Sequence, residues 1–228
     1  MNFYVIERRV PKHLPFDDAA TNAQSSPMRI KLDARPRCER CGQPMGWGEW
    51  LPPFKVLIET WGRQFGDIVE VAATNEILVS DRFRRAYEAS RLVGLTGFEP
   101  VEIDAVLRYK NLAGEPPAYF RANPVRSMSA IDSTASECEW QTPPACAVCR
   151  EGDIKRWQRI VFEPDTWSGE DIFYSRGLPY ALMTSARFKE VCEANAITNV
   201  TFLPAESYGC DFYPWEPQSR THKLPWDQ

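Results

Sequence analysis

Cys38-Glu39-Arg40-Cys41-Gly42 and Cys146-Ala147-Val148-Cys149 are the two stretches of sequence on which the fold prediction depends most. In each stretch two residues separate two cysteines, so a tight turn can place both sulfur atoms on one side of a short loop. Zn²⁺ prefers four ligands at the corners of a tetrahedron, and thiolates serve well. Two such turns supply one complete set. The sequence therefore predicts one structural Zn²⁺ held by Cys38, Cys41, Cys146 and Cys149.

The separation of the two cysteine pairs along the chain is unusual. In a compact zinc ribbon about 15–20 residues lie between the pairs, whereas an entire folded unit fits between Cys41 and Cys146. The two turns must therefore meet through tertiary structure. A redox-active dithiol, separate disulfides and a site without a cofactor are the alternatives. Neither pair lies at the strand-to-helix junction expected of a thioredoxin-like redox site, which disfavours the dithiol.

Features that follow the first cysteine pair recur in the same order after the second. Asp171 follows Asp67 by 104 residues, and Phe188 follows Phe83 by 105 residues. An offset this constant favours an internal repeat over coincidence. The predicted fold class is α+β. Two related α+β units form one pseudo-duplicated protein and are joined by a zinc-ribbon-like site built from the two CxxC knuckles.

This repeat divides the chain into three parts. Residues 1–36 are predicted to form an N-terminal strand and arm, with a long loop from Pro11 to Pro36. Residues 37–135 hold the first knuckle and its α+β unit. Residues 136–228 hold the second knuckle, its α+β unit and a C-terminal tail.

Local patterns predict the elements of the first unit. Ser80 is a suitable cap for a helix over residues 81–92 that stops at Gly94. The apolar spacing in this helix places Phe83, Ala86 and Tyr87 on one face. Strands are expected at residues 3–6, 54–61, 98–103 and 105–109, and a hairpin at the turn-forming residues 111–117.

Composition narrows the class of function. The formal net charge is −4 and the sequence pI is about 5.4, whereas nucleic-acid binders usually carry a basic footprint. We find neither a signal-peptide pattern nor an apolar run long enough to span a membrane, so a cytoplasmic location is expected. Cysteine pairs in that compartment usually bind metals or act in catalysis. The two histidines, His13 and His222, and the absence of known catalytic motifs predict a protein that is not an enzyme.

The C-terminal stretch from Asp211 to Pro217 is aromatic, acidic and stiffened by proline. Such a segment can present rigid anchors to a basic partner at a low cost in ordering entropy. The candidate partner-binding residues are Asp211, Tyr213, Trp215 and Glu216. A tail folded onto its own domain is the equally supported alternative.

The two knuckles, together with Gly66-Asp67-Ile68, Val79-Ser80-Asp81-Arg82-Phe83 and Gly97-Phe98-Glu99-Pro100, resemble the myxobacterial double-CxxCG motif family over most of the chain. Arg150 stands where the second motif of that family has glycine. The resemblance implies an immunity protein paired with a polymorphic toxin, of the kind exchanged between neighbouring cells in swarms.

What the resemblance implies for function is specific. The chain would bind its cognate toxin in the cytosol and cover the catalytic domain, and a nuclease is one candidate for that toxin. The sequence specifies no oligomeric state. The competing hypothesis is a zinc-ribbon nucleic-acid-binding or regulatory module, whose candidate basic face consists of Arg82, Arg84, Arg85 and Arg91.

Overall fold

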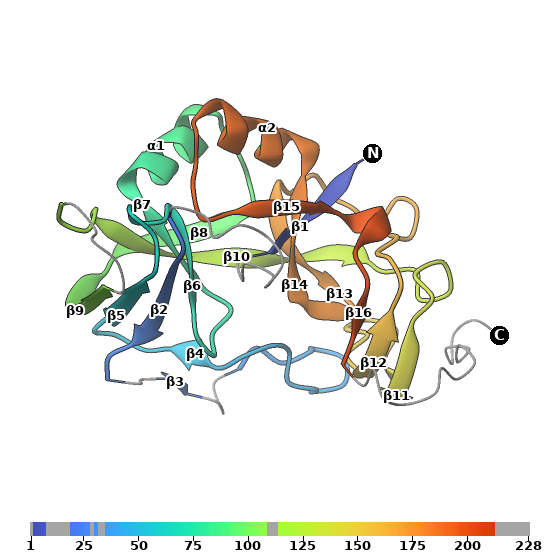
Figure 1. The fold of residues 1–228 in the computed structure, drawn as a ribbon. Helices are drawn as coiled ribbons and strands as arrows, with labels where there is room; N and C mark the ends of the chain where they lie inside the picture. The colour runs from blue at the N-terminus through green and yellow to red at the C-terminus, as the bar shows by residue number, and fades with distance from the viewer. Residues whose placement is uncertain (1, 8–18, 28–29, 32–34, 109–113, 213–228) are drawn as a thin grey trace.

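The computed structural model describes the whole chain except residues 1, 8–18, 28–29, 32–34, 109–113 and 213–228 (Figure 1). Its described part is mostly β-sheet, with 46% strand and 11% helix. Among these residues no helix is both long enough and apolar enough to cross a membrane.

The strands that form the main sheet are β1 (Phe3–Glu7), β2 (Thr21–Ser25), β5 (Lys55–Thr60), β6 (Ile68–Val71), β7 (Ile77–Ser80), β8 (Leu95–Pro100), β9 (Glu102–Arg108), β10 (Tyr119–Ala130), β13 (Ile172–Arg176), β14 (Leu178–Ser185) and β15 (Thr201–Pro204). In the described residues they make one mixed sheet of 11 strands, in the order β15-β1-β14-β13-β10-β7-β6-β2-β5-β9, with β8 paired to β10. The smaller sheets comprise β3 (Ile30–Lys31) with β4 (Glu49–Trp50), and β11 (Glu139–Thr142) with β12 (Asp153–Trp157) and β16 (Cys210–Asp211).

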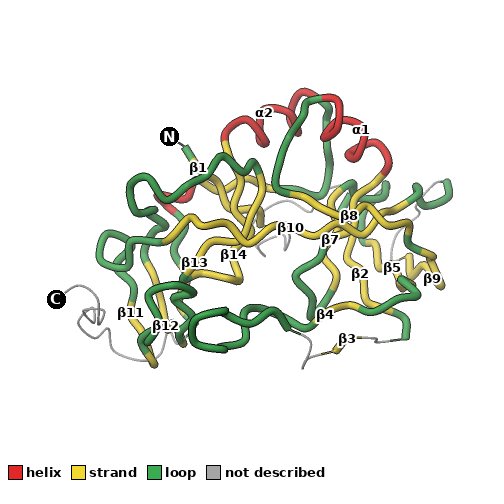
Figure 2. Tube along the Cα trace, turned by 180° about the vertical axis from the view of Figure 1, so that it is seen from behind, coloured by secondary structure: helices red, strands yellow, loops and turns green. Residues whose placement is uncertain are grey.

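Two helices, α1 (Asp81–Ala89) and α2 (Ala186–Ala194), lie next to each other on one face of the main sheet (Figure 1). Their contact is aromatic, with the rings of Phe83 and Phe188 5.9 Å apart. The view from behind shows the small sheets on the side opposite the helices (Figure 2). Strand β7 is buried at every position because it lies at the centre of the sheet with both faces covered.

Both helices begin in the same way. The Ser80 hydroxyl accepts a hydrogen bond from the backbone N–H of Phe83, and the Ser185 hydroxyl accepts one from the N–H of Phe188. These contacts satisfy a backbone donor that the first helical turn leaves unpaired. The predicted Ser80 cap and the buried face of α1 are confirmed, although this helix ends at Ala89 rather than at Leu92.

The prediction of an α+β fold made of two pseudo-duplicated units is wrong. A single, mostly β structure runs through both halves of the chain. Strand β10 belongs to both: its beginning pairs antiparallel with β7, and from Val125 onward it pairs parallel with β13. The recurring residues mark two similar strand-to-helix junctions, and a short sequence likeness of that kind cannot report which strands share a sheet.

Two local predictions also fail for a tertiary reason. Residues 21–25, predicted as loop, form β2 between β5 and β6 because Thr21 and Ala23 are buried there. Strand β9 pairs in parallel with β5 along its length, and β10 takes β7, β8 and β13 as neighbours, so the predicted hairpin is absent from the described pairings. Pairing with distant strands overrides weak local propensity.

Asp67 connects the start of α1 to a distant loop. Its carboxylate accepts hydrogen bonds from the Ser80 hydroxyl at 2.5 Å, from the Thr198 N–H at 2.9 Å and from the Thr198 hydroxyl at 2.8 Å. The Arg82 guanidinium forms an ion pair with the same group. Burial opposes ionisation of Asp67, yet these donors outweigh burial and hold its pKa below the usual range.

We therefore expect an acid-dependent loss of stability that Asp67 controls. A lowered native pKa stabilises the fold above the unfolded pKa of about 3.9, and this contribution is lost as pH falls through the native pKa. Asp67→Asn should lower the free energy of unfolding by about 1.5–3 kcal/mol at pH 7 and flatten the acid limb. Urea denaturation at pH values from about 3 to 7, a range that includes the unfolded pKa of about 3.9, measures both effects. The exposed Asp104→Asn variant is the control, and equal acid limbs for both variants would contradict the assignment.

Candidate metal centre

The four cysteines of the two CxxC turns converge on one point. Their sulfur atoms all lie within 4.8 Å of one another. The sulfurs of Cys38 and Cys146 are 4.0 Å apart, and those of Cys41 and Cys149 are 3.7 Å apart. A tetrahedral ion with Zn–S bonds of about 2.3 Å separates its sulfurs by about 3.8 Å. The separations therefore suit a metal ion far better than disulfides, whose sulfurs lie about 2 Å apart.

The first knuckle is a turn closed by its own backbone. The N–H of Gly42 donates to the carbonyl of Cys38 at 2.8 Å, and the N–H of Cys38 donates to the carbonyl of Gln43 at 2.9 Å. Gly42 has a φ of 73°, in the left-handed region that glycine adopts without strain. The Arg37 guanidinium also donates to the Gly42 carbonyl at 2.9 Å, which fixes the turn from outside.

The second knuckle has the same turn even though it lacks the glycine. The N–H of Arg150 donates to the carbonyl of Cys146 at 2.9 Å, and Arg150 has a φ of 57°. Its buried side chain binds Glu163 through two hydrogen bonds of 2.6 and 2.9 Å and donates to the Ile131 carbonyl at 3.2 Å. These contacts compensate for the left-handed backbone and connect the knuckle to the chain around it.

Paired variants at Arg150 separate the backbone effect from the side-chain effect. Both variants lose the ion pair with Glu163. Arg150→Ala keeps a non-glycine residue in the left-handed region, whereas Arg150→Gly places there the residue that adopts this conformation without strain. We expect Arg150→Gly to be more stable than Arg150→Ala by about 1 kcal/mol, with both below wild type. Chemical denaturation measures this difference. Equal stability of the two variants would show that the turn imposes no backbone strain.

The surroundings of the four sulfurs are unequal. Backbone N–H groups of Cys149 and Val148 point at the Cys146 sulfur and lower the pKa of that thiol to about 6. The pKa of Cys38 is lowered chiefly by the backbone N–H of Cys41. Burial raises the pKa of Cys149 to about 12. A divalent cation would stabilise all the thiolates together, because metal binding displaces thiol protons.

The other three cysteines lie outside this cluster. Cys192 lies on the buried face of α2 in the core, and burial raises its pKa to about 12. Cys138 is also buried, and it does not join the four converging sulfurs. Cys210 lies on β16, where it is paired with Trp157. His13 and His222 lie outside the described residues.

Only one of the predicted partner-binding residues can be placed. Asp211 lies on β16 and forms an ion pair with Arg156 at 3.1 Å, so its charge is engaged within the chain. Tyr213, Trp215 and Glu216 lie outside the described residues. The partner role of this segment stays a prediction.

Sequence reasoning missed a cavity that adjoins the four cysteines. It has a volume of about 370 Å³, and its lining includes Cys38, Cys149, Arg126 and Glu151. Arg126 lies 3.8 Å from Glu151, and burial raises the pKa of Glu151 to about 7. Nothing in the sequence marks this pair, because its two members come from β10 and from the segment after the second knuckle.

Comparison with known proteins gives the class of this β-rich chain with its four converging cysteines: a model of a family of immunity proteins matches residues 21–207. The match spans well over half of the 228 residues and includes both knuckles. The chain belongs to the immunity protein family Imm11. The resemblance to immunity proteins drawn from the sequence is thereby confirmed. No curated protein matches the chain.

Proposed function

We propose that this chain neutralises a cognate polymorphic toxin by binding its catalytic domain in the cytosol. The family match over residues 21–207 is the observation that supports this proposal most directly. The protein acts by occupying the toxin and not by catalysis. A toxin that acts on nucleic acid has a basic cleft, and the net charge of −4 on this chain favours association with such a cleft.

We further propose that the four cysteines hold a structural Zn²⁺. Four sulfurs at nearly tetrahedral separations, all from unbridged cysteines, fit the ligand set that zinc prefers. The four sulfurs would fill all four coordination positions of the ion and leave none open for a substrate. The ion would therefore have a structural role and no catalytic one. Bound there, it would connect the segment before β4 to the segment between β11 and β12.

Three of the four arginines in the candidate basic face of the competing nucleic-acid module form ion pairs within the chain, and Arg91 is the fourth. Arg82 is ion-paired with Asp67, and Arg84 and Arg85 are ion-paired with Asp81. Helix α1 therefore presents arginines whose charges are largely balanced by neighbouring carboxylates. A phosphate-binding surface needs cations that are available to the ligand.

Co-expression with the toxin encoded by the neighbouring gene tests the function. Cells that produce the toxin catalytic domain alone should stop growing, and cells that also produce this chain should grow. An inactive toxin variant mixed with the purified chain should give a one-to-one complex in size-exclusion chromatography. Absence of both rescue and complex would overturn the proposal.

A further inference from the structure

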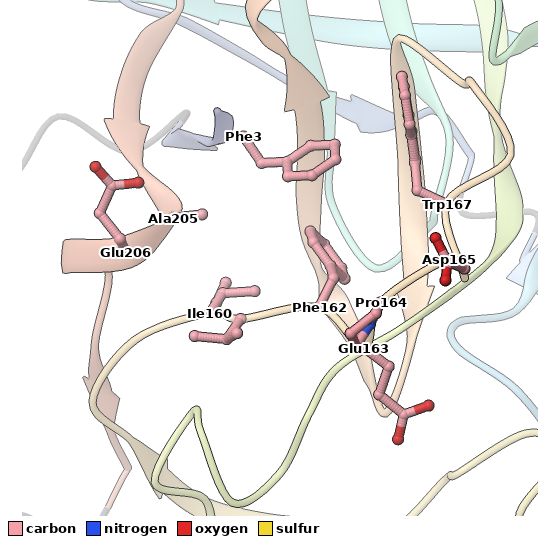
Figure 3. Close-up of a pocket in the computed structure, with 10 residues that line it drawn as sticks. Phe3, Ile160, Phe162, Glu163, Pro164, Asp165, Trp167, Ala205 and Glu206 are labelled. Carbon is pink, nitrogen blue, oxygen red and sulfur yellow. The ribbon is translucent and has the colours of Figure 1, made fainter. Parts of the chain in front are cut away.

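A cavity of about 530 Å³ lies between β1, the loop after β12 and the short 3₁₀ helix Ala205–Ser207 (Figure 3). Its lining shares no residue with the cavity beside the four cysteines. The volume lies within the range of pockets that bind small ligands or single side chains. Nothing in the metal centre or in the family match gives this cavity a role.

Three aromatic side chains form the apolar part of the cavity. The ring of Phe3 lies 4.8 Å from the ring of Phe162 and 5.5 Å from that of Trp167, in edge-to-face arrangements. The indole N–H of Trp167 donates to the Glu170 carbonyl at 3.0 Å, which fixes the ring. All three aromatics are only partly buried, and they pack against the hydrophobic core beneath. The site is therefore rigid and accessible from solvent.

The charged residues of the cavity are all acidic. Its lining contains Glu163, Asp165 and Glu206, and no lysine or arginine. Glu163 is held by Arg150, so its charge is balanced. Asp165 and Glu206 are exposed, and neither has a cationic partner within the part of the chain that the structure describes. Figure 3 shows Glu206 on one side of the aromatic rings and Asp165 on the other.

We propose that this cavity binds an arginine or lysine side chain presented by a basic segment of a protein partner. Long cationic side chains combine an apolar stem with a charged head. The stem would pack on the rings of Phe3, Phe162 and Trp167, whose π-faces also attract cations. The charged head would meet Asp165 or Glu206 in a charge-assisted hydrogen bond.

The partner follows from the proposed function, on which this inference rests: it is the catalytic domain of the toxin. Charge complementarity carries the assignment, because an acidic rim attracts a basic protein surface and repels nucleic acid and anionic ligands. Aromatic residues in a pocket are also typical of the few positions that dominate the free energy of binding. A free amine or guanidine compound is the other possible occupant, and the test distinguishes it.

Calorimetry measures the affinity of the full chain and of its variants for an inactive toxin domain. The toxin is the one encoded by the neighbouring gene. Asp165→Lys combined with Glu206→Lys should weaken binding by about 30-fold or more, because each change places like charges together. Trp167→Ala should weaken it by a similar factor. The control is Glu115→Lys combined with Asp104→Lys, an equal total charge change at two exposed acidic residues outside the cavity. It should change affinity by less than about threefold.

A charge exchange then identifies the occupant. Lysines and arginines of the toxin domain are changed singly to glutamate, and one such change should restore binding to the double-lysine variant while weakening binding to the wild-type chain. Thermal unfolding of every variant checks that it is folded. If Trp167→Ala fails to fold, the double-lysine variant still tests the proposal, because Asp165 and Glu206 are exposed.

The outcomes separate the two proposals. Wild-type affinity in the double-lysine variant overturns the cavity assignment and leaves the immunity function intact. A second outcome is that the double-lysine variant binds the toxin weakly, that no toxin substitution restores binding, and that arginine amide binds the wild-type chain but not the variant. This outcome would assign the cavity to a small cationic ligand and contradict the protein partner. A wild-type chain that binds no toxin at all overturns both proposals.

Discussion

Cys38→Ser combined with Cys41→Ser is expected to abolish zinc binding and to lower the midpoint of thermal unfolding by about 10 °C or more. The wild-type chain should hold one zinc per molecule. Structural zinc contributes about 10 kcal/mol or more in small peptides. A chain of this length also has its own core, so we expect a loss of roughly 4 kcal/mol.

The physical reason is the separation of the two cysteine pairs along the chain. Cys41 and Cys146 belong to segments that lie on either side of eight described strands in sequence order, from β4 to β11. The knuckle segment from Cys38 to Met45 has little secondary structure of its own, and its backbone bonds are mostly within the turn. Without the ion, the two turns would lose the four metal–sulfur bonds that join them.

Elemental analysis and scanning calorimetry of the purified protein measure this prediction. Cys210→Ser, which removes a partly exposed cysteine outside the cluster, is the matched control and should keep its zinc. A chelator added to the wild-type chain should reproduce the thermal shift of the double variant. A wild-type chain without zinc, or a double variant that unfolds at the wild-type temperature, would contradict the prediction.

Arg121→Ala is expected to lower the free energy of unfolding by about 3–5 kcal/mol, because it leaves a carboxylate buried without its partner. The side chains of Arg121 and Glu76 are only 10% and 6% exposed, and they pair at 3.0 Å. The guanidinium also lies 4.6 Å from the centre of the Phe54 ring and 3.2 Å from Glu99. Removing the guanidinium therefore breaks two ion pairs and a cation–π contact at once.

Urea denaturation of three variants tests this explanation. Lys55→Ala removes an exposed ion pair with Glu102 and should stay within about 1 kcal/mol of wild type. Adding Glu76→Gln to Arg121→Ala should recover part of the loss, because the buried group is then neutral. If Arg121→Ala costs no more than Lys55→Ala, burial of the pair does not determine its contribution.

The cysteine cluster could be predicted from the sequence because its signal is local. A CxxC turn brings two sulfurs together whatever the surrounding fold, and two turns make a tetrahedral set. The Ser80 cap was predictable for the same reason, since the contact spans three residues. The match to Imm11 supports the class of immunity proteins. In the sequence, only the family resemblance indicated this class; no local pattern did.

The sheet could not be predicted, because its order depends on contacts between distant residues. Strand β2 has a polar sequence, Thr21-Asn22-Ala23-Gln24-Ser25, and becomes a strand only because β5 and β6 pair with it on either side. The repeated Asp and Phe positions mark two similar helix starts, but the architecture inferred from the repeat is wrong. The cavity in Figure 3 could not be predicted either, because two residues that line it, Phe3 and Glu206, are separated by nearly the whole chain.

The position of β1 has a consequence for the order in which the chain can fold during synthesis. This strand lies between β14 and β15, so residues 3–7 have no sheet neighbours until residues 178–204 have been made. The ribosome must therefore release nearly the complete polypeptide before the sheet can close around its first strand. A chain cut short before β15 would leave its first strand with an open edge.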